Sequence, residues 1–167
     1  MTESRISEQM APRVHAWLVP WRLAVAERPG GGGRNHRRDR RFAEIAWWSA
    51  HGVTGVGAGM RSRHALDDYA AAGWEVRWEP LITPAQAGAR LPLLVAAVIE
   101  LLEAGPGAVL VHCDLPGEYL AAADAALRLG LGLAADRHEA FTATRRDGLP
   151  VGSLASSLVG RYEPAAA

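Results

Sequence analysis

The residue types that could do chemistry are concentrated in the segment 112–119. His112 and Cys113 are adjacent there, and Asp114, Glu118 and Tyr119 follow closely. A thiol is a nucleophile when it is ionised, and carboxyl and phenol groups can transfer protons. This combination predicts a polar site that suits a neutral or cationic substrate and that supports acid–base or cysteine chemistry.

The composition argues against several other classes of site. Cys113 is the only cysteine among 167 residues, so the chain forms neither an internal disulfide nor a thiolate zinc site. The six histidines show no paired spacing of metal ligands. The 18 basic and 18 acidic residues give a net charge of zero, which argues against a general nucleic-acid binder. We therefore expect no metal, no cofactor and no nucleic-acid partner.

Length and hydropathy predict the number of domains and the cellular location of the protein. A chain of 167 residues fits one domain that can bury a sufficient core without disulfides or metals. The sequence predicts no apolar run long enough to span a membrane, and its polar start predicts no secretory signal. These features predict a cytoplasmic protein without a membrane partner, and they assign no oligomeric state.

Strand and helix patterns alternate along the chain. The continuously apolar run at 108–112 is typical of a strand buried in the middle of a parallel sheet. Thr83 and Pro84 are a good helix cap and first helical residue. Strands are predicted at residues 15–26 (two short strands), 53–56, 74–80 and 108–112, and helices at 40–51, 65–72, 83–103, 118–129, 134–145 and 153–162.

This alternation predicts a single α/β domain over residues 15–163, with a mostly parallel central sheet flanked by helices. Residues 1–14 are predicted to be a flexible N-terminus, and residues 164–167 a tail. Ligands of such sheets bind at the carboxyl ends of the strands. That rule places the loop from His112 to Tyr119 at the expected site.

Arginines elsewhere provide further candidate ligand-binding residues. The run 30–33 is all glycine and opens the basic stretch 34–41, which is interpreted as a flexible, solvated loop. The alternative is a mobile arginine cluster for an anionic ligand, with Arg37 and Arg38 as candidates. Arg61 follows the predicted strand 53–56 at its carboxyl end and is a candidate for the pocket beside Cys113.

The order of these segments resembles the superfamily of cysteine-dependent protein tyrosine and dual-specificity phosphatases, in a small bacterial form. The resemblance covers roughly residues 15–163 and rests on segments 51–56, 74–81, 109–113 and 145–163. It implies a phosphatase-like fold and a cysteine nucleophile in a phosphate-binding loop. It also implies a phosphate-clamping arginine six residues after the cysteine and an aspartate general acid on a separate loop.

The signature loop is degenerate. Of the family pattern His-Cys-x-x-Gly-x-x-Arg, only His112 and Cys113 match in place, and Gly117 lies one position late. Tyr119 stands where the arginine is expected. No aspartate occurs between Asp68 and Asp114, so the general acid is missing too.

Asp114 and Glu118 add negative charge to a loop that holds a phosphate dianion in the family. Such carboxylates repel phosphate and raise the pKa of the Cys113 thiol. The sequence therefore predicts a pseudophosphatase without standard activity. It would bind a small molecule or a protein ligand at the Cys113 loop, with His112 and Gly117 among the ligand-binding residues.

Two other functions stay open at this point. One is an enzyme with repurposed acid–base or cysteine chemistry at Cys113, Asp114, Glu118 and Tyr119, for instance in a bacterial biosynthetic pathway. The other is a true phosphatase that takes its arginine from the stretch 34–41. The structural alternative is that Cys113 is a buried thiol, that His112 orients the loop, and that Asp114 and Glu118 cap the following helix.

Overall fold

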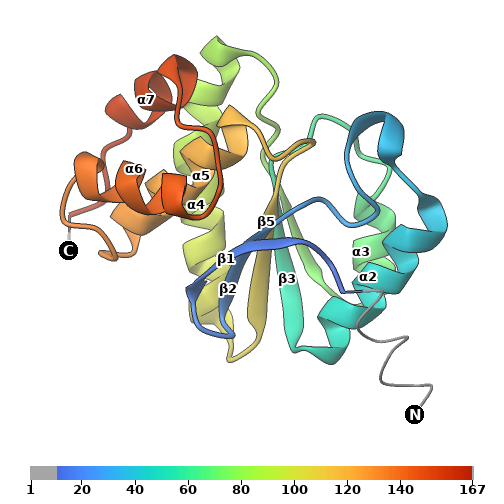
Figure 1. Ribbon diagram of the computed structural model, residues 1–167. Helices are drawn as coiled ribbons and strands as arrows, with labels where there is room; N and C mark the ends of the chain where they lie inside the picture. Colours follow the sequence, from blue (N-terminus) through green and yellow to red (C-terminus); the bar gives the residue numbers. More distant parts are fainter. Residues whose placement is uncertain (1–10, 167) are drawn as a thin grey trace.

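A five-stranded sheet with strand order β1-β2-β5-β3-β4 forms the centre of the molecule (Figure 1). The computed structural model describes residues 11–166. The strands are β1 (Val14–Val19), β2 (Leu23–Ala26), β3 (Val53–Ala58), β4 (Glu75–Trp78) and β5 (Ala108–His112). Within these residues β1 and β2 pair antiparallel, and the other neighbouring strands pair parallel. The predicted mostly parallel sheet is therefore confirmed.

Helices cover both faces of this sheet, as Figure 1 shows, with α2 and α3 on one side and α4 to α7 on the other. The helices are α2 (Arg38–Ala50), α3 (Leu66–Ala71), α4 (Pro84–Ala104), α5 (Glu118–Gly130), α6 (Arg137–Arg146) and α7 (Ser153–Gly160), with a short 3-10 turn η1 (Gly33–Asn35). The predicted helices match these elements to within a few residues at each end.

Strand β5 lies between β2 and β3, and all of its residues are buried. Its side chains alternate between the two layers, as the pleat of a strand requires. Leu110 belongs to the core formed with α2 and α3, whereas Val109 and Val111 belong to the core formed with α4 and α5. Burial on both faces explains why the strand is continuously apolar, and it fixes the position of the Cys113 loop.

Helix α4 begins where the sequence predicts, because the Thr83 side chain accepts a hydrogen bond from the Gln86 N–H at 3.3 Å. The helix is long and apolar enough to cross a membrane by length and composition alone, which corrects the prediction that no such run exists. Leu91, Leu94 and Val98 are fully buried in the core beside the sheet. In this fold α4 therefore serves as a core helix.

The predicted flexible N-terminus, residues 1–14, includes Val14, which belongs to strand β1. Residues 1–10 lie outside the described part of the chain, but Val14 already pairs with Ala26 in the sheet. At the other end, residues 164–166 belong to no helix or strand, and residue 167 lies outside the described part.

The glycine run 30–33 is anchored, which differs from the predicted solvated loop. Gly30 and Gly31 are buried and have φ angles of 91° and 84°, a region that glycine adopts without strain. The Gly30 N–H donates to Glu44 Oε2 at 2.9 Å. Arg41 contacts His36 at 2.7 Å and pairs with Asp68 at 2.7 Å. These contacts fix the loop against α2 and α3.

Candidate functional site at the end of strand β5

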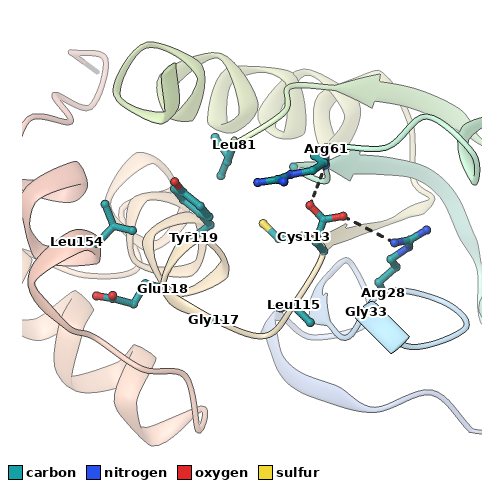
Figure 2. A pocket seen from close by; sticks show the side chains of 12 residues that line it. Arg28, Gly33, Arg61, Leu81, Cys113, Leu115, Gly117, Glu118, Tyr119 and Leu154 are labelled. Atoms are coloured by element: carbon teal, nitrogen blue, oxygen red, sulfur yellow. Dashed lines mark hydrogen bonds and ion pairs between the residues drawn. The ribbon is translucent and has the colours of Figure 1, made fainter. Parts of the chain in front are cut away.

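A cavity of about 620 Å³ opens at the carboxyl end of the sheet (Figure 2). The loop after β5, the loop after β3 and the start of α5 contribute to its wall. It brings together most of the predicted site residues, namely Cys113, Asp114, Gly117, Glu118, Tyr119 and Arg61. The topology rule for parallel sheets thus located the cavity, since all these residues follow strand ends or open the next helix.

His112 lies behind this cavity rather than in its wall. The ring is fully buried, with Nε2 at 2.9 Å from the Tyr69 hydroxyl and Nδ1 at 3.2 Å from the Cys113 carbonyl oxygen. Because a carbonyl only accepts, Nδ1–H donates to Cys113 and Nε2 accepts from Tyr69. His112 therefore orients the loop and does not line the cavity, which differs from its predicted place among the ligand-binding residues.

Burial of His112 makes the stability of the fold depend on pH. Burial is the main cause that lowers the pKa of His112, to about 4. The unfolded chain binds a proton near the ordinary value of about 6.5, so stability is lost as the pH falls from there towards the folded value. We expect the free energy of unfolding to drop by about 2 kcal/mol between about pH 7 and pH 5 from this group alone.

Urea unfolding of the wild type and of His112→Asn at both pH values measures this contribution. The variant should be less stable at neutral pH, and its stability should change with pH by about 2 kcal/mol less than that of the wild type. Equal pH dependence in the two proteins would contradict the assignment to His112.

Cys113 is held against the backbone of the neighbouring loop and is only 4% exposed. A Cβ atom at Gly59 would lie 2.9 Å from Cys113 Sγ, so only glycine leaves room for the thiol there. Burial, followed by the charge of Asp114, raises the pKa of the Cys113 thiol far above its ordinary value. The thiol is therefore protonated at neutral pH. The sequence predicted the effect of the carboxylate on this pKa and left burial of the thiol as an alternative, and burial is the larger of the two effects.

Asp114 is bound to two groups of the protein itself, Arg61 and Arg28, and dashed lines lead to both of these residues in Figure 2. Its Oδ2 accepts a hydrogen bond from the Arg61 N–H at 2.9 Å, and its Oδ1 lies 3.7 Å from Arg28 Nη1. Sequence reasoning missed Arg28, although it follows β2 as Asp114 follows β5. Those strands are parallel neighbours, so their carboxyl ends meet.

Glu118 points away from Cys113, towards Leu154 in α7 (Figure 2). Its Oε1 accepts a hydrogen bond from the Ala155 N–H at 3.2 Å. Gly152, at the N-cap of α7, has no side chain to do this, so Glu118 caps that helix instead. Of the two carboxylates in this loop, only that of Asp114 therefore lies beside the thiol. Glu118 therefore caps a helix, as the structural alternative predicted, but the helix is α7 and not α5.

Tyr119 and Arg61 face one another across the cavity (Figure 2). The Tyr119 hydroxyl donates to the Ile82 carbonyl oxygen at 3.2 Å. Burial raises the pKa of Tyr119, and the nearby charge of Arg61 opposes that shift. Among residues 11–166, no carboxylate lies within ion-pair distance of the Arg61 guanidinium. The cavity thus contains one cationic side chain without an anionic partner.

The arginines of the stretch 34–41 do not line the cavity, which corrects the assignment of Arg37 and Arg38 as ligand-binding residues. Arg38 lies over the Phe42 ring at 5.5 Å, and Arg37 is exposed at the N-cap of α2. Arg40 and Arg41 are held in ion pairs within the domain. Gly33 is the residue through which this part of the chain reaches the cavity.

Within residues 11–166, no group of three or more His, Cys, Asp or Glu side chains is arranged to hold a metal ion. Much of the remaining wall is apolar and includes Leu81, Leu115 and Leu154. The site therefore combines apolar surface with two arginines, the ion-paired carboxylate of Asp114, the helix-capping carboxylate of Glu118 and a protonated thiol.

The sequence matches no family model and no curated protein, but its fold matches solved structures. Tk-PTP in its active form is 17% identical, covers 83% of this chain and 89% of its own, and has a TM-score of 0.63. Human DUSP28 is 22% identical, with 91% and 93% covered and a TM-score of 0.66. TpbA of P. aeruginosa is 18% identical, with 86% and 81% covered and a TM-score of 0.58. At identities this low, the structural similarity shows a shared fold and nothing more.

Proposed function

We propose that this chain, which has the fold of the cysteine-dependent protein tyrosine and dual-specificity phosphatases, is a binding module without standard phosphatase activity. The ligand would occupy the cavity beside Cys113. A volume of about 620 Å³ suits a small molecule better than a protein segment, since small-molecule sites span roughly 300–1,000 Å³. We also propose that the protein is located in the cytoplasm.

The position of Asp114 is the observation that carries this proposal. Its carboxylate lies beside the thiol and already engages the Arg28 guanidinium and the Arg61 N–H. A phosphate placed there would compete for both groups and face a fixed negative charge. Two unit charges about 4 Å apart repel by about 4 kcal/mol at an effective dielectric constant of 20. This repulsion opposes both phosphate binding and ionisation of Cys113.

Two missing groups add support. Tyr119 stands where the family resemblance expects the clamping arginine, and its hydroxyl is bonded to the Ile82 carbonyl. The nearest carboxylate to the expected general acid is Glu79, which pairs with Arg90 at 2.9 Å. The two positions at which the family resemblance expects the clamping arginine and the general acid therefore hold no residue suited to those roles.

An enzyme with repurposed chemistry is the second candidate, because the cavity is open and the thiol lies on its wall. Acid–base catalysis needs a group that is free to exchange a proton at working pH. Asp114 is ion-paired, Glu118 caps α7 and Cys113 is protonated. These roles favour the binding module over the enzyme.

Hydrolysis of p-nitrophenyl phosphate tests the proposal. We expect the wild type to show no more turnover than Cys113→Ser between about pH 5 and pH 8, because the thiolate is not formed in that range. An established cysteine-dependent phosphatase assayed in parallel confirms that the conditions support the reaction. Clear wild-type turnover that disappears in Cys113→Ser would contradict the proposal.

A further inference from the structure

The charges that line the cavity balance in number, with Arg28 and Arg61 against Asp114 and Glu118, but they are not paired evenly. Arg28 and Asp114 offset each other, and the Glu118 carboxylate lies at the start of α7. Cys113 adds no charge because its thiol is protonated. Arg61 remains, with its guanidinium directed into the cavity (Figure 2).

A further feature, the start of helix α5, favours an anionic group at this place. Helix α5 begins at the cavity, and Gly117 at its N-cap provides no side-chain cap. Such a helix start carries a partial positive charge and free N–H groups.

The rest of the wall selects an apolar body. Leu81 lies on one side of the cavity and Leu154 on another, with the Tyr119 ring between them (Figure 2). Leu115 is 57% exposed at the cavity mouth, where a ligand would cover it. Covering such surface is favourable in proportion to the apolar area removed from water.

We infer that the cavity takes an apolar monocarboxylate, in which one carboxylate pairs with Arg61 and an aromatic or acyl body lies against the leucines. This inference rests on the proposed function and adds a ligand class to it. A single carboxylate matches one guanidinium in charge and can bind it through two hydrogen bonds. A phosphate dianion carries twice the charge of one guanidinium, and Asp114 would repel it more strongly than a monocarboxylate. The cationic substrate expected from the sequence would instead be repelled by Arg61.

Isothermal titration calorimetry with three compounds that share one apolar body tests the ligand class. The compounds are 4-phenylbutyrate, its neutral amide and 4-phenylbutyl phosphate. We expect the carboxylate to bind at least about tenfold more tightly than the amide, which is about 1.4 kcal/mol, and more tightly than the phosphate. Equal binding of the amide, tightest binding of the phosphate, or binding of none of the three would overturn the inference.

The variant Arg61→Gln tests the assigned partner. The variant keeps the backbone N–H that binds Asp114, so the loop retains its anchor. The substitution should weaken the binding of 4-phenylbutyrate by about tenfold and leave the affinity for the amide unchanged. Arg63→Gln is the matched control, because Arg63 is an exposed arginine in the same loop and lies over the Trp78 ring at 4.9 Å. An equal loss in both variants would contradict a specific role for Arg61.

The same titrations separate this inference from the proposed function. Hydrolysis of 4-phenylbutyl phosphate that depends on Cys113 would contradict the proposed function. Without hydrolysis, a failure of 4-phenylbutyrate to bind would overturn the ligand class alone.

Discussion

Replacing Arg128 by Met should lower the free energy of unfolding by about 3–5 kcal/mol, the cost typical of breaking a buried ion pair by removing one partner. Arg128 Nε donates to Asp124 Oδ1 at 2.9 Å, and Nη2 donates to Asp147 Oδ2 at 2.5 Å. Asp124 is fully buried, and its other oxygen has no hydrogen-bond partner in the described residues. Without Arg128, its charge would remain in the core between α5 and α6.

Measurements at acidic pH distinguish an unpaired Asp124 charge from a simple loss of packing as the cause of this destabilisation. Thr144 donates to the same Asp124 oxygen at 2.6 Å, but a hydroxyl cannot neutralise a carboxylate. Burial already raises the pKa of Asp124 in the intact network. Protonation removes the buried charge, so the deficit of Arg128→Met should shrink as the pH is lowered towards about 5.

Urea unfolding followed by circular dichroism measures both effects. Arg145→Met is the matched control, because Arg145 is exposed on α6 and should change stability by less than about 0.5 kcal/mol. A loss in Arg128→Met no larger than in this control would show that the network contributes little. The network matters for the site because it fixes α6 on α5, the helix that begins with Glu118 and Tyr119.

Features that depend on local sequence were predicted well. The apolar run before Cys113 forms the central strand, and Thr83 caps α4. The rule that ligands bind at the carboxyl ends of parallel strands correctly predicts the position of the cavity. Each of these inferences uses residues that are close in the sequence or a rule about sheet topology.

Features that depend on contacts between distant segments were missed. Arg28 meets Asp114 only because β2 and β5 are neighbours, and Glu118 reaches α7 only because the C-terminal helices fold back on α5. A carboxylate in a loop has the same sequence signal whether it faces a ligand or caps a helix. Arg37 and Arg38 show the converse error, since basic composition does not reveal which way a segment faces.

Cys113 should react with iodoacetamide at least about 100-fold more slowly in the native protein than in the unfolded chain at about pH 8. The thiolate is the reacting species, and each unit by which its pKa rises removes about nine-tenths of the thiolate. Burial and then Asp114 raise this pKa well above its ordinary value. Mass spectrometry of intact protein measures the rate directly, because the chain has one cysteine.

Asp114→Asn separates the two causes of this inertness. It removes the neighbouring negative charge but leaves the thiol buried, so alkylation should become faster by about tenfold or less, corresponding to one pKa unit, and stay slower than in the unfolded chain. Glu118→Gln is the matched control, since that carboxylate caps α7 and points away from the thiol. A native rate equal to or above the unfolded rate would mean an ionised, phosphatase-like thiol. The fold alone would then be a better guide to chemistry than the carboxylate beside Cys113.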